Sequence, residues 1–179
     1  MNTPNKLTLL RMVSVPFFIV ALYLNYNFAA IVIFAISSFT DYLDGHIARK
    51  NNLVTNFGKL MDPLADKILT ISALVCFIEM KVPYLYAWMV VIIIARELLV
   101  TGIRMIAMGD GKVIAASMWG KAKTVSQLAA IISIMVDRLV PLSFGNFHLT
   151  QVLIWAAVVL TVYSGFDYMK KNFSLLDFK

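Results

Sequence analysis

The stretch FAAIVIFAISSFTDYLDGHIAR, residues 28–49, begins as an apolar run and ends in a motif that carries two aspartates. We expect a single helix over the whole stretch, with its last turns extending beyond the apolar part. A carboxylate at the centre of a membrane helix costs about 2.5 to 3.5 kcal/mol on insertion scales. Asp41 and Asp44 therefore need a partner or a ligand.

Two further aspartates, Asp62 and Asp66, occur in GKLMDPLADK, residues 58–67. Steps of three and four residues place Asp41 with Asp44 on one helix face, and Asp62 with Asp66 on another. Four converging carboxylates repel one another unless cations neutralise them, and sites built only from oxygen ligands select hard divalent ions. The sequence predicts a metal site for Mg²⁺ first, and for Mn²⁺ or Ca²⁺ next.

The composition places this acidic pattern in a membrane. Hydrophobic residues make up 60% of the 179 residues, and the mean hydropathy is +0.80. Soluble domains contain roughly 45 to 50% apolar residues, so we expect an integral membrane protein. We expect one domain over residues 1–179, and we read no removable signal peptide in MNTPNKLTLLRM.

The apolar segments predict an all-α bundle of six transmembrane helices joined by short links. A turn is expected at residues 25–27, and a polar link at 109–112. Pro63 is expected to bend or begin the third helix beside the acidic residues. The segments cover residues 7–24, 28–49, 58–80, 84–107, 114–136 and the stretch from 149 through 163.

Most basic residues fall on one side of the predicted bundle. By the positive-inside rule that side is cytoplasmic, and both termini lie there with the four aspartates nearby. We therefore expect a multi-pass protein of the cytoplasmic (inner) membrane, with its active site at the cytoplasmic face. The net charge of +6 favours anionic headgroups and anionic substrates as partners, and not nucleic acid.

Read as one pattern, residues 41–66 follow DxxDGxxAR, then eight residues, then GxxxDxxxD. This pattern resembles the signature of the CDP-alcohol phosphotransferases at every defined position. The motifs NxPNxLTxxR near the start, ARELLVTGIR at residues 95–104 and GKAKTVSQ at 120–127 resemble the branch of that family whose acceptor is glycerol 3-phosphate.

The resemblance implies a six-helix membrane enzyme that moves a phosphatidyl group from CDP-diacylglycerol to sn-glycerol 3-phosphate, giving phosphatidylglycerol phosphate and CMP. It implies two Mg²⁺ ions, with Mn²⁺ as a possible substitute, held by Asp41, Asp44 and Asp62. Asp66 is expected to be the general base, and it can also touch the second metal. A homodimer surrounded by membrane lipids is expected from the same resemblance.

Donor binding is expected at small and basic residues of the same motifs. Glycines allow close approach of a nucleotide or a helix, and arginine presents a fork suited to phosphate. Asn5 and Thr8 either cap the first helix or contact the nucleotide. The expected donor-binding residues are Asn5, Thr8, Gly45, Ala48, Arg49 and Gly58.

The acceptor phosphate calls for basic side chains. Arg96 is the sharpest candidate because it interrupts an apolar segment; the alternative is an ion pair with Glu97 or with an aspartate, and adjacency on a helix weakens the Glu97 version. Lys59 is either in the site or an interfacial lysine. The expected acceptor-binding residues are Lys59, Arg96, Arg104, Lys121 and Lys123.

Two alternatives remain open from the sequence. Related enzymes use serine, inositol phosphate or phosphatidylglycerol as the acceptor on the same scaffold. A divalent-cation carrier is a second class, because acids inside a membrane also mark ion pathways. A carrier would favour aspartates at the midplane and an internal repeat, and no repeat is found here.

Overall fold

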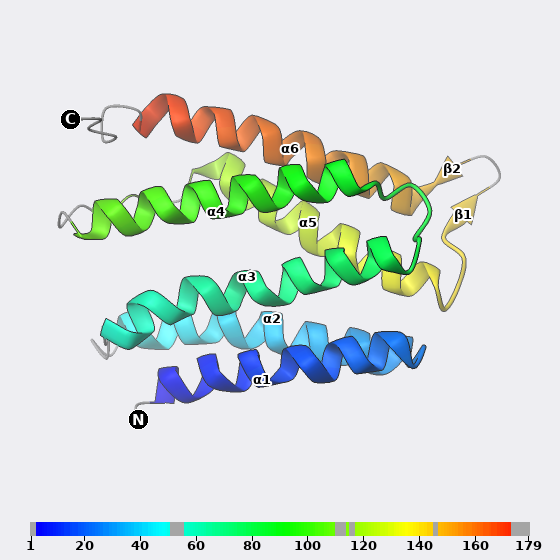
Figure 1. Ribbon diagram of the computed structural model, residues 1–179, viewed down its shortest axis with the longest axis horizontal. Coiled ribbons are helices and arrows are strands. Elements are labelled where there is room, and N and C mark those ends of the chain that lie inside the picture. The colour runs from blue at the N-terminus through cyan, green and yellow to red at the C-terminus, as the bar shows by residue number, and fades with distance from the viewer. Residues whose placement is uncertain (1–2, 51–55, 110–113, 115–116, 145–146, 173–179) are drawn as a thin grey trace. The chain divides into compact units, whose positions relative to one another are not determined.

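The computed structural model describes the backbone of residues 3–50, 56–109, 114, 117–144 and 147–172 (Figure 1). It describes the side chains of the same residues except 3–7, 41–50, 56–63, 66 and 143–147. The described backbone is mostly helical, with one short pair of strands and with turns between the elements. The elements are α1 (Thr3–Tyr23), α2 (Asn27–Lys50), α3 (Asn56–Glu79), α4 (Ala87–Gly109), α5 (Met118–Asp137), β1 (Ser143–Phe144), β2 (Phe147–His148) and α6 (Leu149–Asn172).

The chain divides into two compact units. Unit 1 comprises Met1–Glu79 and Met135–Pro141, and it contains α1, α2 and α3. Unit 2 comprises Met80–Ile134 and Leu142–Lys179, and it contains α4, most of α5, the strands and α6.

Unit 1 is built around α1, which contacts both α2 and α3. Helices α1 and α3 run in one direction and α2 runs in the other (Figure 1). Phe18 of α1 and Phe34 of α2 are both fully buried, with ring centroids 5.7 Å apart. At one end of α1, the hydroxyl of Tyr23 donates a hydrogen bond to the carboxylate of Glu79 at the end of α3.

The turn between α1 and α2 lies where the sequence predicts it. Asn25 has a φ of 58°, in the left-handed region that asparagine enters more readily than most residues. The amide of Tyr26 donates to the carbonyl of Ala21 at 2.9 Å, which satisfies one of the last carbonyls of α1. Arg138 Nη2 donates to Asn25 Oδ1 at 2.6 Å, so the turn is held by a residue far along the chain.

In unit 2, α4 packs against α6, and the two helices run in the same direction (Figure 1). Trp88 and Trp155 pair with centroids 5.9 Å apart near the starts of the two helices. Gln127 of α5 donates to Thr161 of α6 at 3.0 Å, and both side chains are buried. A buried amide and a buried hydroxyl thus satisfy each other, as buried polar groups require.

Four helices begin two or more residues away from the predicted start, and the first of them, α1, begins at Thr3 and not at residue 7. Helix α4 begins at Ala87 and not at residue 84, because Lys81 and Tyr84 adopt positive φ values of 52° and 66° around Pro83. Helix α5 begins at Met118 and not at residue 114. Its first turn is capped by Ser117, whose Oγ accepts a hydrogen bond from the amide of Gly120 at 3.1 Å.

The third helix also starts earlier than expected. Helix α3 begins at Asn56, so Pro63 lies inside the helix and does not begin it. The antiparallel pair β1 and β2, with Ser143 opposite His148, was not predicted at all.

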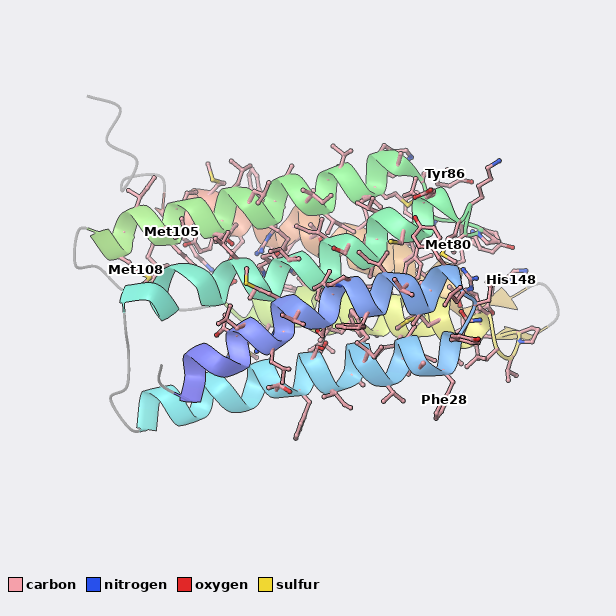
Figure 2. All side chains as sticks on the ribbon, turned by 60° about the horizontal axis from the view of Figure 1, so that its bottom comes forward. Phe28, Met80, Tyr86, Met105, Met108 and His148 are labelled. Carbon is pink, nitrogen blue, oxygen red and sulfur yellow. The ribbon has the colours of Figure 1, made fainter. Side chains whose placement is uncertain are left out.

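The outer faces of the helices carry large apolar side chains. Phe28 projects from α2 with 72% of its surface exposed (Figure 2), and Phe166 of α6 is 70% exposed. Among the described residues, one helix, α6, is both long and apolar enough to cross a membrane; residues 8–23 and 27–40 form shorter apolar helices. Exposed apolar surface of this kind marks contact with lipid or another protein.

Candidate active site

The four aspartates lie on two antiparallel helices of unit 1. The backbone is helical through Asp41 and Asp44 in α2, and through Asp62 and Asp66 in α3. Helix α2 ends at Lys50, and α3 begins at Asn56 at the same end of the unit (Figure 1).

At a rise of 1.5 Å per residue, Asp44 lies about 9 Å before the end of α2, and Asp62 lies about 9 Å after the start of α3. Asp41 and Asp66 follow at about 14 and 15 Å. The two acidic pairs are therefore at matching depths on helices that contact each other. Their side chains lie outside the described residues, and no cluster of metal-ligating side chains occurs among those that are described. The donor set itself, four carboxylates, fits a hard divalent ion.

The predicted donor-binding residues fall on the same helices. Gly45, Ala48 and Arg49 lie in the last turns of α2 and Gly58 lies in the first turn of α3; the side chains there, and that of Asn5, are outside the described residues. Thr8 is described, and it is 1% exposed within α1. Because α1 begins at Thr3, neither Asn5 nor Thr8 caps it, which removes that alternative.

A groove of about 220 Å³ lies between α1 and α2, next to the acidic motif. Arg11, which is 4% exposed, lines it together with Thr40, the residue before Asp41. Ser14 and Ser37 also line the groove and share a hydrogen bond of 2.8 Å. Ser14 gives its only hydroxyl proton to the carbonyl of Arg11, so Ser37 is the donor in this pair. The remaining lining residues are Leu10, Ile33 and Ile36.

In unit 2, Glu97 joins two of the predicted acceptor-binding residues. Arg96 Nη1 lies 3.2 Å from Glu97 Oε1, and Lys123 Nζ donates to the same oxygen. The side chains are 12%, 3% and 2% exposed for Arg96, Glu97 and Lys123. Two cationic side chains thus meet on one buried carboxylate oxygen.

The adjacency argument against an Arg96–Glu97 contact was wrong. Neighbouring Cβ atoms do diverge on a helix, but the arginine side chain is long enough to bend back, and two glycines leave it room. A Cβ placed at Gly165 would lie 3.0 Å from Arg96 Cγ, and one at Gly120 would lie 3.8 Å from Arg96 Nη2. Arg96 therefore passes close to α5 and α6 where these helices have no side chain.

The other predicted basic residues lie elsewhere. Lys121 is exposed whereas Lys123 is buried, so these two lysines of α5 do not share an environment. Arg104 lies eight residues after Arg96, about 12 Å along α4, and its guanidinium carbon is 5.5 Å from the centre of the Tyr168 ring. Lys59 is in α3, and its side chain lies outside the described residues.

Comparison with known proteins identifies the scaffold. Residues 1–163 match the family model described as CDP-alcohol phosphatidyltransferase. The chain is 40% identical over 190 aligned residues to a CDP-diacylglycerol--glycerol-3-phosphate 3-phosphatidyltransferase of Bacillus subtilis, covering 98% of this chain and 97% of the relative.

The chain belongs to the CDP-alcohol phosphatidyltransferase family. Proteins with the same printed name from Haemophilus influenzae and Rickettsia felis are similar at 34% and 35% identity. The first alignment covers 98% of this chain and 96% of the relative, and the second covers 94% of each. The resemblance found in the aspartate motif is thereby confirmed at the level of the family.

Three polar residues of this CDP-alcohol phosphatidyltransferase were missed as candidates from the sequence. Glu97 was considered only as a competitor for Arg96, although it lies at the centre of the buried cluster. Arg11 was noted only as part of a motif, and Tyr168 was not considered. A charged residue inside an apolar stretch is the one signal that could have singled out Glu97 and Arg11.

Proposed function

We propose that this protein transfers the phosphatidyl group of CDP-diacylglycerol to the hydroxyl of sn-glycerol 3-phosphate, producing phosphatidylglycerol phosphate and CMP. The observation that carries the proposal is the near full-length similarity to a Bacillus subtilis protein named for this reaction. The complete aspartate pattern in α2 and α3 supports the same chemistry.

Two divalent ions, Mg²⁺ or Mn²⁺, would be held by Asp41, Asp44 and Asp62, with Asp66 able to reach the second. The matching depths of the two acidic pairs support a shared site. When bound, such ions neutralise the diphosphate and stabilise the departing CMP. Arg49 adds a planar fork for a phosphate, and Gly45 and Gly58 let the nucleotide approach the helix backbones. Ala48, Asn5 and Thr8 complete the proposed donor site.

The proposed reaction is an attack of the acceptor hydroxyl oxygen on the phosphorus that carries the diacylglycerol group. The new phosphorus–oxygen bond forms, the bond to CMP breaks, and Asp66 takes the proton of the acceptor hydroxyl. General-base assistance of this kind contributes about 10²- to 10⁴-fold.

The acceptor phosphate is proposed to bind to basic residues of α4 and α5. The buried Nε of Arg96, which has no hydrogen-bond partner among the described residues, supports this, because buried donors are nearly always hydrogen-bonded and a phosphate oxygen could accept from it. Arg104, Lys121 and Lys59 are further members of the proposed acceptor site. The exposure of Lys121 gives it the weakest case among those described.

The bundle is proposed to cross the cytoplasmic membrane six times, with both termini and the active site on the cytoplasmic side. The apolar outer faces of the described helices support contact with lipid. The groove between α1 and α2, apolar apart from Arg11, Thr40 and two paired serines, suits part of an acyl chain of the donor. A homodimer is proposed from the family resemblance alone.

The test is CMP release by purified protein in lipid nanodiscs with CDP-diacylglycerol and Mg²⁺. Separate reactions contain glycerol 3-phosphate, serine, inositol phosphate or phosphatidylglycerol, and the Asp41→Asn variant is the control for background hydrolysis. Release only with glycerol 3-phosphate supports the proposal. Release with another alcohol instead would identify that alcohol as the acceptor. No release with any alcohol would overturn the proposed transferase activity.

A further inference from the structure

A buried hydrogen bond joins α5 to α6 inside unit 2. Gln127 Nε2 donates to Thr161 Oγ1 at 3.0 Å, and the two residues are 7% and 0% exposed. Thr161 gives its only hydroxyl proton to the carbonyl of Ala157 at 2.6 Å, so its oxygen serves as the acceptor for Gln127. The direction of the bond is therefore fixed, with the donor on α5 and the acceptor on α6.

On α5, this donor lies one turn from a buried lysine. Lys123 precedes Gln127 by four residues, so both side chains lie on the same face of the helix, about 6 Å apart along its axis. Lys123 is buried and donates to the carboxylate of Glu97 on α4. A movement of α5 along its axis that breaks the bond of Gln127 therefore also moves Lys123 relative to Glu97.

On α6, the acceptor lies one turn from a glycine that faces Arg96. Gly165 follows Thr161 by four residues, and a Cβ added to it would lie 3.0 Å from Arg96 Cγ. The ring contact between Trp119 and Tyr163 joins the same two helices, but these side chains are 43% and 50% exposed. Because hydrogen bonds weaken steeply with distance and angle, the buried bond is the stricter constraint on how the helices align.

We propose that Gln127 is a positioning residue: its bond to Thr161 sets the axial position of α5 relative to α6, and so holds Lys123 at the depth of Glu97. Displacement of α5 would leave a buried amide unsatisfied and take a buried ammonium group from its carboxylate, and both changes are costly. The proposal rests on the proposed function, in which Arg96 and Lys123 bind the phosphate of the acceptor. Gln127 itself is not assigned to contact with the substrate.

The first variant, Thr161→Val, removes the acceptor of the bond and nearly keeps the shape of the side chain. It leaves the buried amide of Gln127 unsatisfied, so the Tm should fall. We also expect a severalfold rise in the KM for glycerol 3-phosphate, because a small misplacement of a binding group weakens binding, while the KM for CDP-diacylglycerol stays unchanged. Thr161→Ser keeps the acceptor hydroxyl and should keep the acceptor KM near the wild-type value.

The decisive variant is the double replacement Gln127→Met, Thr161→Val. It removes both polar groups, so no member of the pair is left unsatisfied and most of the lost Tm should return. The KM for glycerol 3-phosphate should stay raised, because the bond that aligns the helices is still absent. Ser133→Ala is the matched control on α5, since its buried hydroxyl donates at 2.8 Å to the carbonyl of Ala130 in the same helix.

Chemical labelling of Lys123 gives a readout that does not depend on catalysis. In nanodiscs, an amine-reactive reagent followed by mass spectrometry should modify Lys123 faster in the double variant than in the wild type or Ser133→Ala, because a displaced α5 exposes this buried lysine. If wild-type protein releases no CMP with glycerol 3-phosphate but this difference in labelling is found, the proposed function fails and the positioning role of Gln127 stands.

Two results would overturn the proposal. The first is a double variant whose Tm and acceptor KM both return to the wild-type values, since the bond would then contribute to stability alone. The second is equal labelling of Lys123 in the wild type, the double variant and Ser133→Ala, which would show that Lys123 keeps its place without the bond.

Discussion

Arg96 and Glu97 are consecutive in α4, and their side chains nevertheless meet, with Nη1 of the arginine 3.2 Å from Oε1 of the glutamate. Lys123 of α5 binds the same carboxylate oxygen. The contact is therefore part of a three-residue cluster around one carboxylate oxygen. Arg96 can form an ion pair with Glu97 and also bind the acceptor phosphate, and the two roles can be tested separately.

Replacing Arg96 by glutamine should raise the KM for glycerol 3-phosphate about ten- to a hundredfold, because a charge-assisted hydrogen bond is worth roughly 1.5 to 3 kcal/mol. The donor KM should change little. Arg96→Lys should restore only part of the affinity, since a point charge cannot reproduce the planar fork. Steady-state CMP release at varied acceptor and donor concentrations checks this. Normal acceptor kinetics with a lowered Tm would assign Arg96 to structure alone.

Replacing Glu97 by glutamine should destabilise the protein by about 3 to 5 kcal/mol, because it removes the carboxylate that neutralises a buried lysine. The double variant Glu97→Gln, Lys123→Met should recover much of the loss, since both charges are then gone. Thermal unfolding of both variants in the same detergent provides the measurement. Equal stability of Glu97→Gln and wild type would contradict a structural role for the carboxylate.

The Gly165→Ala variant tests the space through which Arg96 passes. The new Cβ would lie 3.0 Å from Arg96 Cγ, so the arginine must shift by a few tenths of an ångström. Because misplacement of a binding group by 1 Å can cost about 10²-fold, we expect a severalfold rise in the acceptor KM. Gly102→Ala is the control, since nothing lies within 4 Å of its added Cβ. Identical kinetics for the two variants would show that the space beside Gly165 has no effect on acceptor binding.

Chelation of divalent ions should abolish CMP release, and added Mg²⁺ or Mn²⁺ should restore it. Asp41→Asn and Asp62→Asn should each shift the metal dependence to higher concentration, because each removes one charged ligand. The measurement is activity against free metal concentration, set with a metal buffer. Full activity in excess chelator would rule out the two-metal site.

Asp66→Asn should lower kcat by about 10²- to 10⁴-fold with little change in donor binding, because loss of a general base acts on the transition state. Binding of CDP-diacylglycerol, measured without acceptor, separates the two effects. A collapse of donor affinity together with turnover would place Asp66 among the metal ligands.

The sequence alone was sufficient for the helical scaffold and the family. The apolar run from Phe28 into the aspartate motif predicted one helix, and α2 indeed continues to Lys50. The local pattern of apolar and polar residues is enough to predict such a helix, because helix formation depends on residues within one or two turns. The starts of α4 and α5 were missed because a turn around Pro83 and a cap by Ser117 outweigh apolar composition.

The polar contacts of unit 2 were largely beyond prediction. Tyr168 meets Arg104, and Gly165 makes room for Arg96, only because α4 and α6 run in the same direction side by side. No periodicity within either helix encodes that alignment. The predicted metal and donor residues remain predictions, since most of their side chains lie outside the described residues.

The bond between Ser14 and Ser37 fixes the register of α1 against α2. If α1 slid along its neighbour by one helical turn, about 5.4 Å, the hydroxyl of Ser37 would lose its acceptor in an apolar groove, while Ser14 would keep its bond to the carbonyl of Arg11. Ser37 precedes Asp41 by about 6 Å of helix, so the same bond sets how deep Thr8 and Arg11 lie relative to the first aspartate. A hydrogen bond between two small, neutral side chains outside the acidic motif thus helps to position α1 relative to the reaction centre.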